Sequence, residues 1–462
     1  MTAAVTGSAP WRVSVGWLRG LSADRRDVLL YGMSAVFAGI TAVAMSIPLY
    51  REWGRLAVGP YAAATVWMLV VAHRRATATR AAGGTVPNGR PWKAARLAAF
   101  LIVLLGATVV PLALEVVWAS EGNAALHVQP EVLVVERAGV RAAHGQDPYQ
   151  VVDRNGHILI RQDAIPVYEL YYPYLPGMVV FGFSSGSKVE ARLTDARIQF
   201  LVFTVVVAVI GLSRMRPATD ARGRALQTLT ALPTAALPLA TGGDDMPVAA
   251  LMLLGLVALQ RRRPVLAGLA LGAASTLKFT SWPLVLLALF AVTDRTGRRA
   301  AGRYAAAVAC LVVPVVFPVA IHNPSAFIDN VVRFPLGLAG VASPAASALP
   351  GHELVALVPS VHRPYVIVAA VVGLAVLVRY LLRHPPRDAA AVAKVTGWVM
   401  LVAILAAPAT RVGYLLYPIN LFVWAWMFRC SDDPEPSPPP EAPDDDPAAA
   451  QLPSGVSNSS MV

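Results

Sequence analysis

The 462-residue sequence has few charged residues and almost no cysteine. Charged side chains make up 14% of the chain and hydrophobic ones 56%, with a mean hydropathy of +0.56. A soluble domain carries about 25% charged residues, so a soluble fold of this length is excluded. The two cysteines, Cys310 and Cys430, are too few for a disulfide framework or a cysteine-based metal site.

Signals for several other classes of protein are also absent. The chain has no heptad pattern, no fixed-period repeat and no glycine-rich nucleotide-binding loop. The glycines of "GLALGAAS" (268–275) are four residues apart, which is typical of close packing between membrane helices. The net charge of +12 comes from basic residues that separate hydrophobic runs, so we expect no nucleic-acid partner.

Hydrophobic runs of membrane-spanning length recur from Val28 to Trp426. The first run is too long for a signal peptide and has no obvious cleavage site, so we expect it to stay as a span. The segment "YPYLPGMVVFGF" (172–183) is only marginally long enough, and we interpret it as interfacial or re-entrant. We predict an all-α polytopic membrane protein with about twelve transmembrane helices, near 28–48, 57–73, 97–118, 196–213, 226–241, 246–260, 264–278, 280–293, 304–320, 364–381, 390–409 and 413–428.

Basic and mixed segments alternate along the chain. Residues 74–96 carry six basic residues and no acid, whereas 119–172 hold seven acids and four arginines, and 321–363 hold two of each. The positive-inside rule then predicts cytoplasmic termini and two extracytoplasmic loops, 119–172 and 321–363. The predicted organisation is a cytoplasmic N-terminus (1–27), a membrane domain (28–430) and a proline-rich, acidic tail (431–462) that we expect to be disordered and cytoplasmic.

Several polar residues lie on the predicted outer side, in the first outer loop or at the ends of apolar runs, and those within apolar runs are costly and suggest function. They are Glu115, Glu131, Glu136, Asp147, Asp244, Asp245, Lys278 and Arg411.

Each of these residues also has an ordinary structural interpretation. Lys278 and Arg411 could extend to the headgroups, and Asp147 could shape the Asp-Pro-Tyr turn. The two aspartates of "TGGDDMP" (241–247) could cap the following helix, and Glu136 could pair with its neighbour on a solvated helix face. Their convergence on one side of the membrane favours a site.

Several motifs follow a recognisable order. An acid, Glu131, precedes "RAGVRAAHG" (137–145), "DPY" (147–149) and "YYPYLPG" (171–177). Further segments are the glycine-polar junction, basic turn and Lys-x-x-x-Pro stretch of 241–287, "NPSAFIDNVVRFPL" (323–336) and "RVGYLLYPINL" (411–421). Over roughly residues 95–430 the pattern resembles the GT-C membrane glycosyltransferases, in particular glycosyltransferase family 87, which includes polyprenyl-phosphate-mannose-dependent α-mannosyltransferases of actinobacterial cell envelopes.

The resemblance implies a GT-C-like fold with a large extracytoplasmic loop that carries the active site. The expected activity moves a sugar, mannose first, from a polyprenyl-phosphate donor to a lipid or glycan acceptor of the cell envelope, with inversion and without a cofactor or metal. The catalytic acid of the family is typically Asp, whereas this chain has Glu131, so Glu136, Asp147 and Asp195 remain candidates for the base.

Acceptor activation and departure of the phosphate explain these residue types. A carboxylate that removes the acceptor proton accelerates such attack typically 10²–10⁴-fold. The developing charge on the leaving phosphate needs cations, and Lys278 and Arg411 are cations at a suitable depth on the predicted outer side. Further candidates are Asp244 and Asp245, together with Tyr149, Tyr171 and Tyr172, which could stack on sugar rings or form an interfacial aromatic belt.

Other functions remain open. An arabinofuranosyltransferase of the same fold has the same requirements, and a non-catalytic scaffold would tolerate the change to Glu131. A polyprenyl-lipid flippase or transporter also commonly has twelve spans. A transporter should show broken helices in corresponding halves and ionisable residues near the bilayer midplane. Here the polar residues lie at the predicted outer ends of the spans, which favours the transferase.

Overall fold

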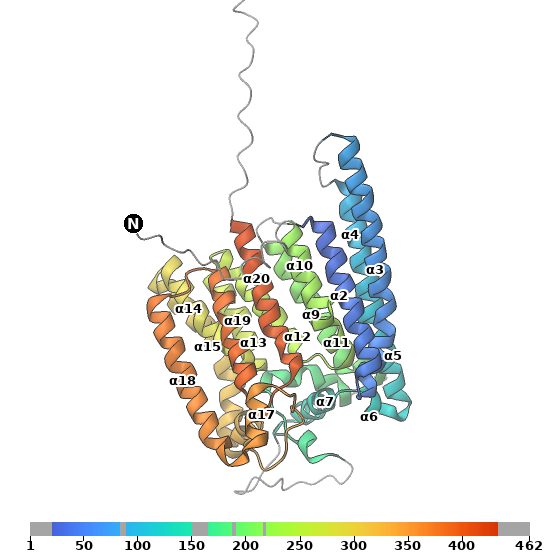
Figure 1. Ribbon diagram of the computed structural model, residues 1–462. Coiled ribbons are helices and arrows are strands. Elements are labelled where there is room, and N and C mark those ends of the chain that lie inside the picture. The colour runs from blue at the N-terminus through green and yellow to red at the C-terminus, as the bar shows by residue number, and fades with distance from the viewer. Residues whose placement is uncertain (1–20, 84–88, 150–164, 187–190, 216–218, 433–462) are drawn as a thin grey trace, which may run out of the picture.

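A computed structural model describes residues 21–83, 89–149, 165–186, 191–215 and 219–432 of the chain. These residues are predominantly helical and contain no β-strand, although one isolated parallel bridge joins Ala346 and Thr410. The helices form one bundle (Figure 1). The all-α prediction is therefore confirmed. Most of the predicted N-terminal segment and nearly all of the predicted tail lie outside the described residues.

The long helices alternate in direction between the two ends of the bundle (Figure 1). A π-helical turn, η1, continues α4 into α5. In chain order the elements are α2 (Ala23–Ala44), α3 (Pro48–Ala81), α4 (Arg90–Val103), η1 (Leu104–Val109), α5 (Val110–Trp118), α9 (Ala196–Arg214), α10 (Thr219–Thr230), α11 (Pro233–Thr241), α12 (Asp245–Gln260), α13 (Pro264–Leu277), α14 (Trp282–Thr296), α15 (Arg298–His322), α18 (His362–Arg383), α19 (Ala389–Ala406) and α20 (Leu416–Asp432).

Short elements gather at the end that is lower in Figure 1, which we call the α7 end. They come mainly from the two predicted extracytoplasmic loops, and 150–164 lie outside the described residues. They are η2 (Ala119–Asn123), α6 (Ala124–His127), α7 (Pro130–Ala143), η3 (Val167–Leu170), η4 (Pro176–Gly186), α8 (Ala191–Thr194), η5 (Phe279–Ser281), α16 (Pro324–Ile328), η6 (Asp329–Arg333), α17 (Pro350–Leu357), η7 (Pro359–Val361) and η8 (Val412–Leu415). Most of the predicted interfacial segment 172–183 forms the 3₁₀ helix η4.

Every predicted span overlaps a described helix or pair of helices. Seven helical segments among the described residues are long and apolar enough to cross a membrane, and α12 and α13 are shorter apolar helices. The span predicted at 226–241 is divided between α10 and α11, because the chain turns at Ala231 and Leu232 before Pro233. The protein is therefore a polytopic membrane protein, while the count of twelve spans stays a prediction.

The first two described helices form a hairpin, and its residues Trp53 and Tyr61 belong to a hydrophobic core that the hairpin shares with α4, η1, α5 and α11. A Cβ at Gly54 would lie 2.5 Å from the Ala42 nitrogen, so the backbones of α2 and α3 touch where glycine allows it. The Trp53 indole donates to the Ala107 carbonyl at 2.9 Å, and the Tyr61 hydroxyl donates to the Ala231 carbonyl at 2.6 Å. These bonds fasten the hairpin to η1 and to the turn between α10 and α11.

Helix α2 begins at Ala23, earlier than the predicted span, because Ser22 caps it and the acids that follow are buried. Asp27 contacts Arg224 and lies 2.6 Å from the Arg96 Nε. Arg96 also contacts Asp220, and the Gln227 amide donates to Asp27 at 3.1 Å. This group, which we call the Asp27 cluster (Asp27, Arg96, Asp220, Arg224 and Gln227), joins α2, α4 and α10 at the end opposite α7.

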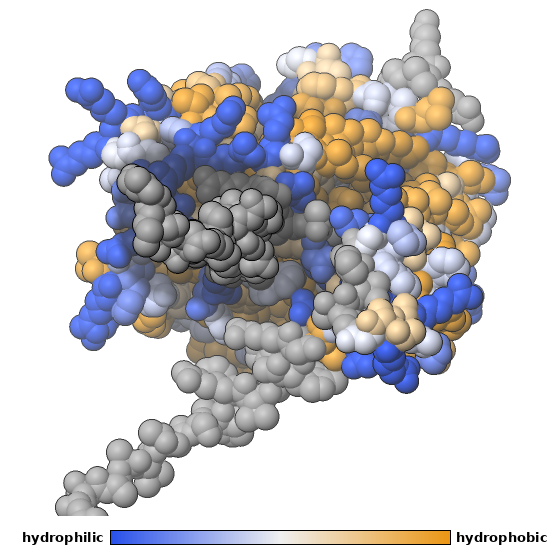
Figure 2. Space-filling model, turned by 90° about the horizontal axis from the view of Figure 1, so that it is seen from above, coloured by the Kyte–Doolittle hydropathy of each residue, from blue (hydrophilic) through white to orange (hydrophobic). Residues whose placement is uncertain are grey.

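The flanks of the bundle are apolar, as expected for contact with lipid. Large hydrophobic side chains are exposed along α2, α9, α15 and α18, and no residue of the predicted span in α18 is buried. Figure 2 looks onto the end opposite α7 and shows hydrophilic residues beside broad hydrophobic areas. Helix α3 has 34 residues, so it is about 51 Å long and exceeds the hydrocarbon core of about 30 Å. With α4 it projects beyond the other helices (Figure 1).

Candidate active site

Three of the predicted site residues meet in a buried cluster at the α7 end. The Lys278 Nζ lies 2.8 Å from Asp244 Oδ2 and 2.5 Å from Asp245 Oδ1. The Tyr417 hydroxyl donates to the same Asp245 oxygen at 2.7 Å, and the ammonium lies 4.9 Å from the centre of the Tyr174 ring. We call Asp244, Asp245, Lys278 and Tyr417 the Lys278 cluster. The cluster contains one cation and two carboxylates, so the net charge of the cluster is negative when all three groups are ionised.

Helix breaks bring these side chains together. Between α11 and α12 the chain turns through Gly242 and Gly243, and Gly243 has a φ of +84°, which favours glycine. Lys278 follows the last residue of α13 in an extended conformation. The two aspartates do not cap α12 through their side chains, and Lys278 is only 9% exposed and does not extend to the surface. The alternatives of capping and of extension to the headgroups are therefore wrong for these three residues.

Glu131 and Arg411, which are 280 positions apart, contact each other as an ion pair. Glu131 lies in the first turn of α7, and Arg411 directly precedes η8. The second carboxylate oxygen of Glu131 is buried and has no hydrogen-bond partner among the described residues. The pair therefore has one oxygen on the cation and one that is available to a further group.

Helix α7 is held in place by close backbone contact with η4. A Cβ at Gly139 would lie 2.2 Å from the Gly182 carbonyl carbon, and one at Gly182 would lie 2.3 Å from the Val135 oxygen. The segment before η4 is tied in turn to the end of α13, because the Leu175 N–H donates to the Leu277 carbonyl at 3.0 Å. The helix that carries Glu131 is thus connected to the residue before Lys278.

Asp147 shapes the Asp-Pro-Tyr turn. Its Oδ1 accepts from the Tyr149 N–H at 2.9 Å, and its Oδ2 accepts from the Asn323 amide at 3.2 Å. Tyr149 and Tyr172 are buried with their rings 5.5 Å apart, and the Tyr172 N–H donates to the Asn330 side chain at 2.6 Å. The motif at 323–336 therefore holds the first loop, and Asp147 is occupied by structural bonds. Neither tyrosine presents an exposed face to a sugar.

Asp195 and Glu136 both serve the start of α9. Asp195 caps the helix, with its Oδ1 accepting from the Arg197 N–H at 2.9 Å, and its carboxylate pairs with the Arg197 guanidinium. Glu136 accepts from the Ala196 N–H at 3.0 Å. The predicted pairing of Glu136 with Arg137 on a solvated face is wrong, because Arg137 binds Glu169 instead. Burial raises the pKa of Glu136 to about 7, with a contribution from nearby Asp195.

The two charged groups of the site are linked by one short segment of the chain. Arg411 directly precedes η8, and Tyr417, six residues after Arg411, donates to Asp245 of the Lys278 cluster. The α7 end therefore holds Glu131 with Arg411 and, nearby, the Lys278 cluster. Asp147, Tyr149 and Tyr172 support the loop around them, and Asp195 and Glu136 lie at the start of α9.

Several participants were not predicted from the sequence. Tyr174 and Tyr417 lie inside the quoted motifs "YYPYLPG" and "RVGYLLYPINL", but no spacing indicates that they face Lys278 and Asp245. Glu115, predicted inside the third span, binds the His127 Nδ1 at 2.7 Å and is completely buried. The histidine had no signal in the sequence beyond its position in the loop.

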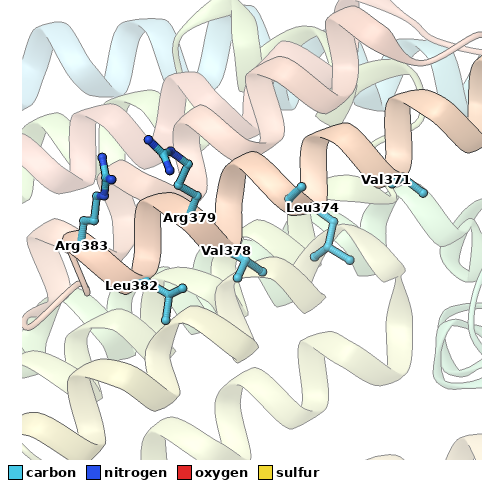
Figure 3. Close-up of a pocket in the computed structure, with 7 residues that line it drawn as sticks. Val371, Leu374, Val378, Arg379, Leu382 and Arg383 are labelled. Atoms are coloured by element: carbon cyan, nitrogen blue, oxygen red, sulfur yellow. The ribbon is translucent and has the colours of Figure 1, made fainter.

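A hollow on the surface lies apart from these charges. It runs along α18, lined by Val371, Leu374, Ala375, Val378, Arg379, Leu382 and Arg383 (Figure 3). All of these residues come from one helix, and the chemistry of the site requires charges that converge from several. We therefore locate the candidate site at the α7 end.

The fold and the site together define the class of the protein. It is a polytopic helical membrane protein with paired acids and cations at the α7 end. The model of Glycosyltransferase family 87 matches residues 191–408, somewhat less than half of the chain. The match indicates a membrane glycosyltransferase. It contains Asp195, Asp244, Asp245 and Lys278, whereas Glu131 and Arg411 lie outside it. No curated protein matched the chain.

Proposed function

We propose that the protein transfers a sugar, mannose first, from a polyprenyl-phosphate donor to a lipid or glycan acceptor of the cell envelope, with inversion at the anomeric carbon. In this proposal the α7 end faces the extracytoplasmic side and both chain termini are cytoplasmic. The many basic residues at the opposite end support that orientation. Glu131 is the general base, and Arg411 binds the donor phosphate.

The observation that carries the proposal is the contact between Glu131 and Arg411. A base and a phosphate-binding cation must both lie within a few ångströms of the anomeric carbon, since one acts on the incoming oxygen and the other on the leaving oxygen. The fold brings these two residue types together from distant parts of the chain. The unpartnered second oxygen of Glu131 gives an acceptor hydroxyl a place to bind.

Donor binding and base activation are coupled in this arrangement. A phosphate matches the fork of the Arg411 guanidinium and competes with the Glu131 carboxylate for it. A carboxylate that loses a paired cation has a higher proton affinity. The acceptor oxygen then bonds to the anomeric carbon while its proton passes to Glu131. The bond from that carbon to the phosphate oxygen breaks, and the polyprenyl phosphate leaves with the electron pair.

The Lys278 cluster has a different role in the proposal from the one that its sequence suggested. Lys278 already faces Asp244 and Asp245, so little of its charge is available to a phosphate. We assign the cluster to shaping the site: the ammonium holds the glycine turn before α12 against the end of α13. The excess negative charge beside Arg411 also favours an uncharged acceptor hydroxyl over a second phosphate.

Glu131→Gln tests the proposal, because it keeps the side-chain shape and removes the ability to accept a proton. We expect turnover of radiolabelled polyprenyl-phosphate mannose by membranes of a deletion strain to fall by about 10² or more. Glu131→Asp should keep part of the activity, because the shorter acid is still a base.

Asp147→Asn and Asp195→Asn are the matched acid-to-amide controls. Each removes a structural bond, so folded protein should decrease more than turnover per folded molecule. If Glu131→Gln transfers sugar normally while either control is inactive, another acid is the base. Activity in all three variants would contradict the mechanism itself.

A further inference from the structure

Gln129 donates three hydrogen bonds immediately before α7. Its backbone N–H donates to the Thr241 carbonyl at 3.1 Å. Its side-chain amide donates to the Thr241 hydroxyl at 3.0 Å and to the Tyr50 hydroxyl at 2.8 Å. An amide group has two hydrogens to donate, so both are used. One side chain therefore joins the start of α7 to the end of α11 and the start of α3.

Glutamine is an unusual residue type at the start of a helix. Gln129 is the N-cap residue of α7, where Ser, Thr, Asp and Asn are preferred because their side chains bind the first backbone N–H groups. The Gln129 side chain makes no capping bond. The side chain lies instead against Gly242, where an added Cβ would be 2.1 Å from the side-chain oxygen of Gln129. Gly242 belongs to the turn that delivers Asp244 and Asp245.

Tyr50 reaches this junction from the N-terminal hairpin. It is the third residue of α3 and is partly buried. The hairpin α2–α3 lies outside the residues that match the family. Tyr50 is thus a contact from that hairpin to the junction between α7 and the glycine turn.

We propose that Gln129 is a positioning residue of the candidate site and that Tyr50 anchors it, so that the N-terminal hairpin completes the site. The inference rests on the proposed function. Glu131 follows Gln129 by two residues, and the glycine turn lies on the other side of the same amide. Gln129 therefore fixes the position of the general base, Glu131, relative to Arg411 and the Lys278 cluster. A displacement of about 1 Å at such a site can lower turnover by as much as 10².

A double-mutant cycle tests the inference. Gln129→Met keeps the length of the side chain and removes its hydrogen bonds, and Tyr50→Phe removes only the hydroxyl. We expect turnover to fall about 10- to 100-fold in Gln129→Met and about 3- to 10-fold in Tyr50→Phe, with the KM for the donor within about twofold of wild type. In the Gln129→Met background, Tyr50→Phe should change turnover less than about twofold, because Tyr50 acts through Gln129.

Tyr61→Phe is the matched control. It removes a hydroxyl from the same helix, and that hydroxyl bonds the Ala231 carbonyl. It should lower thermal stability and leave turnover per folded molecule unchanged. A full Tyr50→Phe effect in the Gln129→Met background would overturn the anchoring role. A rise in donor KM without loss of turnover would overturn positioning in favour of direct contact with the donor.

Hydrogen exchange separates this inference from the proposed function. Backbone amides in the first turns of α7 should exchange faster in Gln129→Met and Tyr50→Phe than in wild type, and Tyr61→Phe should leave them unchanged. If wild-type protein transfers no sugar and the two variants still exchange faster, the proposed transferase function is refuted and the positioning role of Gln129 stands. Unchanged exchange in Gln129→Met would refute the positioning role, even if Glu131→Gln abolishes transfer.

Discussion

The Asp27 cluster, which is largely buried apart from Asp220, and the buried Lys278 cluster are two groups of charges at opposite ends of the bundle. In the first, two arginines balance two aspartates, and Asp27 alone receives bonds from Arg96, Arg224 and Gln227. In the second, a single lysine faces two aspartates. Beside it, the Glu131–Arg411 pair leaves a buried carboxylate oxygen without a partner in the described part of the chain.

The difference distinguishes a structural fastening from a site. Burial of charge occurs in both places, so burial alone indicates neither function. A balanced cluster joins three helices and has little capacity for a further ligand. An unused buried hydrogen-bonding atom, such as the second Glu131 oxygen, gains free energy when a ligand supplies the missing partner.

Removal of one cation from each cluster is the strongest test of the difference between the two clusters. Arg224→Met leaves Asp27 with Arg96 as its remaining cation, whereas Lys278→Met leaves two buried carboxylates without a cation. Removal of a buried charged partner costs about 3–5 kcal/mol of unfolding free energy, and we expect the larger cost in Lys278→Met. Per folded molecule, we expect Arg224→Met to turn over normally and Lys278→Met to lose about 10² or more in sugar transfer. Thermal unfolding of purified protein, combined with the transfer assay, measures both. Lys278→Arg should be partly active, because a planar fork replaces an ammonium poorly. Equal turnover per folded molecule in the two Met variants would remove the distinction.

Arg411→Lys should have a smaller effect, and it tests whether Arg411 binds the donor phosphate. Lysine keeps the charge and loses the bidentate fork. We expect the KM for the donor to rise about tenfold, which corresponds to about 1.4 kcal/mol, and turnover to fall less. Arg333→Lys is the control, since Arg333 is an exposed arginine that pairs with Asp329 four residues earlier. A loss of turnover with unchanged donor KM would contradict the role of Arg411 in binding.

Glu136→Gln should have the smallest effect on turnover, and its effect on stability depends on pH. Burial raises the pKa of Glu136 from 4.5 to about 7, so the folded state disfavours its charge. The wild type therefore loses stability as pH rises from about 4.5 to about 7. Gln keeps an acceptor for the Ala196 N–H, and the variant should be more stable than wild type at pH 8, by about 1–3 kcal/mol. Thermal unfolding at pH 8 and pH 5 measures this gain, which should shrink at pH 5. An equal gain at both values would mean that charge is not its cause.

Much of the fold could be predicted because lipid imposes length and composition on each helix. Predicted spans such as 196–213 and 246–260 differ from their helices by a single residue at one end. The start of α2 was predicted too late, because Asp24 and Asp27 resemble surface residues until their partners on other helices are known. Hydrophobicity indicates where a helix lies along the membrane normal and not which helices are its neighbours.

The site was predicted as a set of residues at one end and not as a set of contacts. Asp244, Asp245 and Lys278 were expected on the same side, but nothing in the sequence pairs them. Glu131 and Arg411 were assigned separate roles and are in contact. Gln129 could not be predicted, because its partners Tyr50 and Thr241 are 79 and 112 positions away. Side-chain bonds between distant segments depend on how the helices pack, which a single sequence does not state.

The excess length of α3 has a practical consequence for imaging this protein. A 48.8 kDa chain embedded largely in detergent or lipid offers few features by which electron-microscope particle images can be aligned. The two antiparallel helices α3 and α4 rise above the rest of the bundle (Figure 1). A rigid soluble domain joined through continuous helix after Ala81 and before Arg90 would stand clear of the membrane at the end away from Glu131. Such a fusion supplies an alignment marker and leaves the candidate site free for donor and acceptor.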